Sequence, residues 1–272
     1  MMGTLRFRRQ TIFFLFIFFC IASVLIGSIG FYHFPRTCIP NVDPKHSWTT
    51  HPSPRIVMLS GERCVANNPA SKCRVMGDLS FYNRREYIAH HQGRYTLRDN
   101  FTSYFEDVVS EGYSPAWAKI KILKDELDRD ENDWIFWVDT DALITNMDIS
   151  LERFLDTRYS LVITRDHHYL NAGVFLLRVN DWSRNFVREL HSRMDKYSNE
   201  QDWMINLLED PSYESDRQVK YLPQCSFNSY WHLKALHRMY RPGDFMIHWA
   251  GHNYDPISFE DWQQGRQFKL PF

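Results

Sequence analysis

Trp134-Ile135-Phe136-Trp137-Val138-Asp139-Thr140-Asp141 decides the fold class of this 272-residue chain. Its first five side chains are all apolar, which is typical of a strand that is covered on both faces. The run ends directly at two carboxylates. Other short apolar runs, at 56–59, 161–164 and 174–177, alternate with amphipathic stretches. This alternation predicts an α/β domain with a mostly parallel central sheet flanked by helices.

The stretches between these runs carry signals for helices. Ser114 and Pro115 have the residue types of an N-cap and a first helical position, and apolar residues follow at roughly helical intervals up to Leu127. Ser198, with Gln201 three residues later, resembles a capping box that starts another helix. A further strand is predicted at 245–248, after the Pro242-Gly243 turn.

The composition excludes several classes of protein. Aromatic residues make up 16% of the chain and hydrophobic residues 44%, so it is neither disordered nor collagen-like. The net charge is −1, and it becomes −4 when the three arginines at positions 6, 8 and 9 are left out. Since nucleic-acid binding requires a basic surface, a nucleic-acid partner is not expected.

The N-terminal region predicts a membrane anchor. Residues 11–32 contain no charged side chain, and a helix of this length reaches about 33 Å, enough to span a bilayer core of about 30 Å. A cleaved signal peptide has a shorter apolar region and a small-residue cleavage site. The preceding arginines favour a cytoplasmic N-terminus. We therefore expect a cytoplasmic tail at 1–10, a signal anchor at 11–32, a Pro-rich stem at 33–54 and a lumenal domain at 55–272.

A lumenal location would make two other features relevant. Asn100-Phe101-Thr102 is an N-glycosylation acceptor, although such triplets also occur by chance in ordinary surface loops. Four cysteines, Cys38, Cys64, Cys73 and Cys225, lie outside the predicted anchor. They allow three disulfide connectivities, and the sequence alone does not choose among them.

Asp139 and Asp141 are the strongest candidates for chemistry. Ligands of open α/β sheets bind at the carboxyl ends of strands, where carboxylates at i and i+2 of an extended chain project to one side. Such a pair suits a divalent cation that keeps positions open for diphosphate oxygens. The alternative is a strand that ends in a solvated acidic turn. His248, at the end of the last predicted strand, could complete the metal site, or could be an ordinary core histidine.

Two further segments allow both a structural and a functional interpretation. Glu200, Gln201 and Asp202 stand at the predicted start of a helix, where capping residues are common but polar groups can also meet an anionic ligand. Asn171, in Asn171-Ala172-Gly173, is either part of a turn or a polar group directed at a substrate hydroxyl.

Taken in order, these segments resemble glycosyltransferase family 34, which contains fungal α-galactosyltransferases and α-mannosyltransferases and plant xyloglucan xylosyltransferases. The matching segments are 56–61, 77–78, 83–91, 115–119, 134–146, 171–178 with Trp182-Ser183, 200–202 and 245–251. The resemblance implies a GT-A fold, a Mn²⁺-dependent nucleotide-sugar donor and retention of anomeric configuration. One departure is Gln92, which stands where the family has glycine.

The resemblance also implies roles for individual residues. Asp139 and Asp141 match the metal and diphosphate ligands, and His248 matches the third metal ligand. Gln201 matches an amide near the reacting sugar carbon, with Glu200, Asp202 and Asn171 beside it as catalytic or sugar-contacting candidates. The remaining residues expected at the donor are Ser60 against the nucleoside, Thr140 and Gly251.

From these observations we expect a Golgi, single-pass type II membrane glycosyltransferase. It would move galactose, mannose or xylose from a nucleotide-diphosphate sugar to a glycan hydroxyl and form an α-glycosidic bond, and it could act in a complex with related glycosyltransferases. The alternative is a non-catalytic glycan-binding or scaffold subunit of such a complex. A metal-dependent phosphohydrolase would need more carboxylate and histidine ligands than the sequence groups together.

Overall fold

The computed structural model describes residues 38, 53–61, 72–166, 169–230 and 240–250. They belong to the unit formed by residues 38–272, which alone is considered below. The predicted cytoplasmic tail, the signal anchor, most of the stem and Gly251 lie outside the described residues. Within the described residues, no helix has both the length and the apolar character needed to cross a membrane.

A six-stranded sheet forms the centre of the domain, in the order β2-β1-β3-β6-β5-β7. Its strands are β1 (Ile56–Leu59), β2 (Thr96–Arg98), β3 (Trp134–Val138), β5 (Leu161–Thr164), β6 (Asn171–Arg178) and β7 (Val219–Leu222). The pairs β1·β2, β1·β3 and β5·β7 are parallel, whereas β6 is antiparallel to both β3 and β5. The prediction of an α/β fold with a mostly parallel sheet is therefore confirmed, with β6 as the exception.

The direction and length of β6 correct the sequence expectation. This strand begins at Asn171, three residues before the predicted run at 174–177. Only residues 165–170 connect β5 to β6. A parallel crossover needs about a dozen residues or more, so the short connection forces the two strands to run antiparallel.

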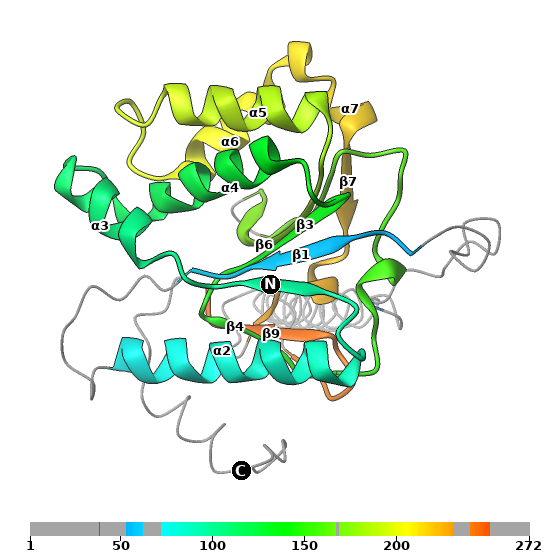
Figure 1. Cartoon of the computed structure of the whole chain (residues 1–272). Helices are drawn as coiled ribbons and strands as arrows, with labels where there is room; N and C mark the ends of the chain where they lie inside the picture. The colour runs from blue at the N-terminus through cyan, green and yellow to red at the C-terminus, as the bar shows by residue number, and fades with distance from the viewer. Residues whose placement is uncertain (1–37, 39–52, 62–71, 167–168, 231–239, 251–272) are drawn as a thin grey trace, which may run out of the picture. The chain divides into compact units, whose positions relative to one another are not determined.

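Four helices cover one face of this sheet (Figure 1): α3 (Thr102–Ser110), α4 (Ala118–Arg129), α5 (Asp181–Ser192) and α6 (Glu200–Glu209). The strands present alternate residues to this layer, because side chains along a strand point to opposite faces. Val57 and Leu59 of β1 pack with the helices, whereas Ile56 and Met58 belong to the core on the other face. Every residue of β3 is buried, as its apolar sequence predicts.

The other face carries helix α2 (Lys72–His90) and a second sheet, in the order β4-β9-β8 (Figure 1). The strands of this sheet are β4 (Ala142–Ile144), β8 (Ser229–Tyr230) and β9 (Met246–His248). The predicted strand at 245–248 thus exists as β9, paired with β4 and β8. Ala142 and His248 are partners in the β4·β9 register. This pairing brings residues near the end of the described chain beside the acidic triplet.

The helix starts follow the sequence signals, with one correction. Ser114 caps a 3₁₀ turn (Pro115–Trp117), and α4 continues from it. Helix α6 is capped by Asn199, whose side chain accepts a hydrogen bond from the backbone N–H of Asp202, and not by Ser198 as the sequence predicts. The remaining elements are α7 (Ser215–Gln218) and 3₁₀ turns at Leu151–Arg153, Pro211–Tyr213 and Gln224–Ser226.

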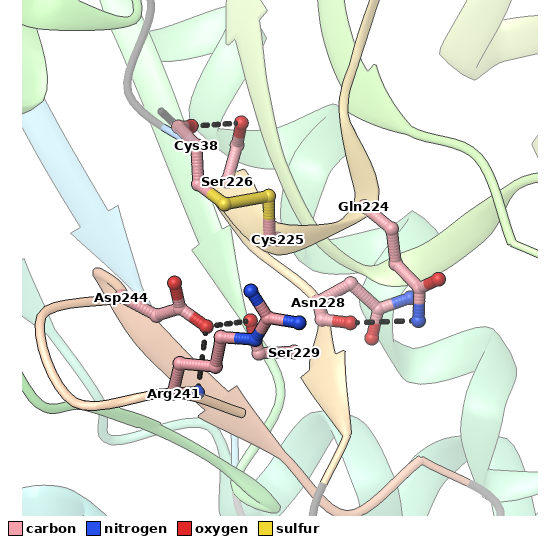
Figure 2. Close-up of a disulfide and its surroundings, with 8 residues drawn as sticks. All are labelled: Cys38, Gln224, Cys225, Ser226, Asn228, Ser229, Arg241 and Asp244. Carbon is pink, nitrogen blue, oxygen red and sulfur yellow. Dashed lines mark hydrogen bonds between the residues drawn. A yellow bond between two sulfur atoms is a disulfide. The ribbon is translucent and has the colours of Figure 1, made fainter. Parts of the chain in front are cut away.

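A disulfide joins Cys38 to Cys225, residues that are 187 positions apart (Figure 2). This pair occurs in one of the three connectivities that the sequence allows. Ser226 Oγ donates a 2.6 Å hydrogen bond to the Cys38 carbonyl. Gln224 Nε2 donates to the Asn228 carbonyl at 3.1 Å. These bonds fix the short segment that leads to β8.

Candidate active site

A pocket lies beyond the carboxyl ends of β1 and β3. Its lining comes from both strand ends, from the helices α3, α4 and α6 and from the 3₁₀ turn before α4, and consists of Gly61, Phe105, Pro115, Ala116, Lys119, Trp137, Asp139, Thr140, Asp141 and Glu200. Both carboxylates of the acidic triplet therefore line one pocket, as the sequence predicts. The position agrees with the general rule that open α/β sheets bind ligands at the carboxyl ends of their strands.

Asp139 is held by donors from two neighbouring elements. Its carboxylate accepts a 2.6 Å hydrogen bond from Trp137 Nε1 and lies 3.2 Å from Lys119 Nζ. Its backbone N–H donates to the carbonyl of Gly173 in β6, at 2.8 Å. These bonds fix the end of β3 against β6 and turn this carboxylate toward α4.

Lys119 is a component of the site to which the sequence analysis assigned no role. It is only 5% exposed, and its ammonium contacts Glu200 Oε1 at 2.7 Å and the Ala172 carbonyl at 2.8 Å, besides Asp139. The sequence feature that pointed to Lys119 was a lysine between Trp117 and Ile120, on the buried face of α4. Lysine is rarely buried unless it is paired, so its position in this stripe indicated carboxylate partners.

The charges of this cluster balance one another. Burial acts to lower the pKa of Lys119, but the carboxylates of Asp139 and Glu200 outweigh it and raise the pKa above its ordinary value. Burial raises the pKa of Asp139 although Lys119 opposes it. The lysine is therefore a permanent cation at the wall of the pocket, between two acidic side chains.

Asp141 faces a different partner. Its Oδ1 lies 3.2 Å from Nε2 of His248, which is 2% exposed. Burial acts to raise the pKa of Asp141, but the interaction with His248 outweighs burial and lowers it. The imidazole and the second carboxylate of the triplet thus converge, although 107 positions separate them in the sequence.

The orientation of His248 is set by residues behind it. Its Nδ1 lies 2.7 Å from Asn228 Oδ1, and the amide nitrogen of Asn228 donates to the Tyr230 hydroxyl at 3.2 Å. Because the Asn228 oxygen therefore faces the imidazole, Nδ1 carries the proton and donates it. Nε2 then faces Asp141, and a hydrogen bond of this kind at Nδ1 is the arrangement found behind metal-binding histidines.

Gly173 in β6 leaves space for this imidazole. A Cβ added at Gly173 would lie 2.5 Å from Cε1 and 3.0 Å from Nε2 of His248. It would also lie 3.0 Å from Asn171 Oδ1. A side chain at this position would displace the histidine, so close packing accounts for the glycine of Asn171-Ala172-Gly173.

The donor set fits a divalent cation in part. Asp141 supplies a carboxylate oxygen at the pocket, and His248 supplies an imidazole nitrogen 3.2 Å from it. Divalent cations commonly take few protein ligands together with phosphate oxygens and water. Within the described residues, no group of three or more His, Cys, Asp or Glu side chains surrounds a single point. Asp139, the third predicted ligand, faces Lys119 and Trp137.

The other predicted site residues fall into two groups. Glu200 is buried in the pocket wall, and Gln201 next to it accepts a 2.9 Å hydrogen bond from the Ala172 backbone N–H. Asn171 accepts from the Gly173 backbone N–H at 2.9 Å and donates to Asp166 at 3.2 Å. These three residues meet around the start of β6.

Asp202 and Ser60 are placed differently. Asp202 lies on the exposed first turn of α6, where its carboxylate accepts a 2.8 Å hydrogen bond from the Asn199 amide. Ser60 is buried, and its backbone N–H donates to the Arg98 carbonyl at 3.2 Å. Neither residue lines the pocket, whereas Gly61, next to Ser60, does.

Comparison with known proteins identifies related chains. Residues 52–160 match the galactosyl transferase GMA12/MNN10 family, and residues 117–255 match a family described as nucleotide-diphospho-sugar transferase. An α-1,2-galactosyltransferase of Schizosaccharomyces pombe is 26% identical over 247 residues, an alignment that covers 76% of this chain and 64% of the relative. Glycosyltransferase 6 of Arabidopsis thaliana is 28% identical over 183 residues, covering 58% of this chain and 40% of the relative.

A solved structure supports the fold assignment. A glycosyltransferase involved in glycosylation of the major capsid of PBCV-1 superimposes with a TM-score of 0.54, at 13% sequence identity, covering 77% of this chain and 100% of that chain. At this identity the likeness concerns the fold alone, and it agrees with the GT-A expectation. The chain spans less than two thirds of the length of the two relatives above. This chain belongs to the nucleotide-diphospho-sugar transferase family, whose model matches half of it, and its residues 52–160 are similar to the galactosyl transferase GMA12/MNN10 family, in line with the resemblance to glycosyltransferase family 34.

Proposed function

We propose that this protein is a retaining glycosyltransferase that moves galactose, mannose or xylose from a nucleotide-diphosphate sugar to a glycan hydroxyl, forming an α-glycosidic bond. The observation that carries the proposal is the pocket at the end of β3. There Asp139 and Asp141 line one wall, and His248 lies 3.2 Å from Asp141. Carboxylates and a histidine at this edge of the sheet suit a metal-bound diphosphate.

The proposed cofactor is Mn²⁺, held by Asp141 and His248 with Asp139 as the third ligand. When bound, the cation acts as a Lewis acid that stabilises the negative charge on the departing nucleoside diphosphate. Asp139 can join the set because Lys119 also pairs with Glu200, so the lysine keeps a carboxylate partner.

The residues around the start of β6 would orient the sugar. Lys119 holds Glu200 in the pocket wall, and the Ala172 backbone N–H holds the oxygen of Gln201. An amide is a weak nucleophile compared with a carboxylate, so Gln201 is better suited to contact the sugar than to form a covalent intermediate. We therefore favour attack by the acceptor on the same face as the departing phosphate. A glycosyl-enzyme trapped on Glu200 or Asp202 would contradict this route.

The test is a screen of nucleotide sugars with the full chain. UDP-galactose, UDP-xylose and GDP-mannose are incubated with and without Mn²⁺, and release of the nucleoside diphosphate is measured. We expect Mn²⁺-stimulated hydrolysis of one donor, and its loss in Asp141→Ala. Full activity of that variant would contradict the site. Nucleotide binding without turnover of any donor would instead support a non-catalytic subunit of a glycosyltransferase complex.

We further propose that the domain faces the Golgi lumen behind a type II signal anchor. The Cys38–Cys225 disulfide supports this location, because such bonds persist in oxidising compartments. Asn100 lies exposed between β2 and α3, where an oligosaccharide could be attached. Treatment of the cell-derived protein with an endoglycosidase should increase its mobility, and Asn100→Gln should abolish that shift. An unglycosylated, reduced protein in cells would contradict lumenal exposure.

A further inference from the structure

Helix α2 lies against the segment that carries the acidic triplet, and one face of the helix bonds to the backbone of that segment. Asn83 pairs with both the N–H and the carbonyl of Ile144, each at 2.8 Å, as a neighbouring strand would. The Tyr87 hydroxyl donates to the Ile149 carbonyl at 2.8 Å. His91 Nε2 lies 2.8 Å from the Met147 carbonyl. Two side chains of the helix and that of the residue after it therefore fix residues 144–149.

Arg84, on the same face of α2, bonds to the acidic turn itself. One terminal nitrogen of its guanidinium, NH2, donates to the carbonyls of Asp139 at 2.7 Å and of Ala142 at 3.1 Å, with Val138 at 3.4 Å. The other terminal nitrogen, NH1, donates to Ser80 one helical turn earlier. The fork of the guanidinium thus connects α2 to the backbone on both sides of Asp139 and Asp141.

A buried arginine of this kind is costly. Arg84 is 0% exposed, its Nε has no hydrogen-bond partner, and within the described residues no carboxylate lies within ion-pair distance of it. An arginine side chain keeps its positive charge in proteins. Burying a cation without a direct anionic partner disfavours folding, so packing alone does not explain this residue.

We propose that Arg84 is a positioning residue that holds the Asp139–Asp141 turn so that both carboxylates face the pocket. The expected effect on nucleotide binding rests on the proposed function, in which this turn binds the diphosphate and the metal. Two features support it. The donated hydrogen bonds reach carbonyls before and after Asp141, so they define the turn from both ends. The positive charge also lies behind two partly buried carboxylates and offsets their mutual repulsion.

The experiment compares Arg84→Met and Arg84→Lys with Asn83→Ala in the full chain. Asn83 is the matched control, because it holds the same segment from the same helix but bonds at Ile144. Hydrogen exchange of peptides covering 138–144 reports the turn without any ligand, and peptides from β5 and β6 report the global fold. Binding of Mn²⁺ with UDP or with GDP is measured by calorimetry.

We expect Arg84→Met to lose about tenfold or more of its exchange protection in 138–144 while β5 and β6 keep theirs, because the turn opens locally. Its affinity for the Mn²⁺–nucleotide pair should fall about tenfold or more, since outer residues that orient ligands have effects of this size. Arg84→Lys retains the charge and should recover part of both losses. Asn83→Ala should lower the melting temperature but change affinity by less than about threefold.

Equal affinity in Arg84→Met and wild type, or losses in Arg84→Met and Asn83→Ala that simply follow their melting temperatures, would overturn the inference. If Arg84→Met does not fold, Arg84→Lys decides the question by the same two measurements. A wild-type chain that binds neither nucleotide would refute the proposed function. The exchange data would in that case still decide whether Arg84 orders the turn.

Discussion

The two carboxylates of the acidic triplet stand two positions apart and belong to different surroundings. Asp139 faces the helical side of the sheet, where Lys119 and Trp137 bind it. Asp141 faces the small sheet, where His248 is its partner. The first surrounding supplies a permanent cation. The second supplies an imidazole nitrogen, which lies 3.2 Å from the carboxylate oxygen.

This difference indicates a division of roles. Asp139 is already paired with an ammonium, whereas Asp141 lies beside a side chain that is itself a common metal ligand. We infer that the Asp141 side is the primary cation site and that the Asp139 side connects it to the sugar-contacting residues through Lys119 and Glu200. The following experiments test this division, from the largest expected effect to the smallest.

Removing the charge of Asp141 should have the largest effect. Asp141→Asn is expected to reduce Mn²⁺-stimulated donor hydrolysis by about 10³-fold or more, because several kcal/mol of stabilisation of the leaving group depend on the cation. Steady-state assays with the donor found in the screen measure the change. The control is Asp128→Asn, which removes an exposed carboxylate paired with Lys124. Comparable losses in both variants would contradict the assignment.

Removing the ammonium of Lys119, beside Asp139, should mainly reduce the stability of the fold. Lys119→Met leaves the buried Glu200 and the partly buried Asp139 without their common partner, which should lower the free energy of unfolding by about 3 kcal/mol or more. Adding Glu200→Gln to this variant should restore part of the loss. Lys124→Met, which breaks an exposed pair, should cost about 0.5 kcal/mol or less. Denaturant titration compares the four proteins, and a negligible effect of Lys119→Met would show that the cluster is not coupled.

Crowding the imidazole should weaken cation binding without removing a ligand. Gly173→Ala places a methyl group where it would meet His248, so we expect the affinity for Mn²⁺ with UDP or GDP to fall about 10- to 100-fold. Gly112→Ala is the control, because Gly112 has a φ of +86° but no neighbour within 4 Å of an added Cβ. Calorimetry should show unchanged affinity there. Unchanged affinity in Gly173→Ala would mean that His248 does not bind the cation.

The ion pairs of Asp156 provide a comparison with a carboxylate that stabilises the fold and lies outside the pocket. Hydrogen bonds from Arg158, aided by Lys220, hold the pKa of Asp156 well below its usual range. Since the folded pKa lies below the unfolded one, the carboxylate stabilises the fold above the unfolded value, and this contribution is lost as the pH falls toward the folded value. Asp156→Asn should cost about 1 kcal/mol at pH 7 and clearly less near pH 2, by thermal unfolding. An undiminished difference at pH 2 would contradict this origin.

The smallest effect should come from the end of α2. Gln92 has a φ of +57° and occupies the position where the family has glycine. Gly93 N–H donates to the Ile88 carbonyl at 2.9 Å, the bond expected when a helix ends in a left-handed residue. Gln92→Gly should therefore stabilise the domain by about 0.5–1 kcal/mol, whereas Gln92→Ala should not. Chemical denaturation measures both, and equal effects would argue against backbone strain.

The sequence was most informative where local pattern decides structure. The buried strand β3, the acidic triplet at its end and the helical start at Ser114 and Pro115 follow from apolar periodicity and capping residues. The antiparallel direction of β6 could also have been predicted from the sequence, because the connection from β5 is too short for a crossover. The predicted N-cap of α6 was wrong by one residue, because both Ser198 and Asn199 are good capping residues.

What could not be predicted depends on contacts between distant segments. Nothing near Asn228 indicates that it orients His248, and the Arg84 side chain reaches the acidic turn only because α2 packs on β4. Lys119 stood out as a charged residue on a buried helix face, but its two partners come from β3 and α6. These positions are set by the way the two sheets and the helices pack together. The disulfide partner of Cys38 is a further example.

Pulsed electron paramagnetic resonance of Mn²⁺ bound to the full chain with UDP or GDP tests the central claim most directly. If His248 Nε2 is a ligand beside Asp141, the spectrum will show coupling of the electron spin to a directly bound nitrogen, and His248→Gln will abolish that coupling. Bound Mn²⁺ without nitrogen coupling, or coupling that survives in His248→Gln, would contradict the account.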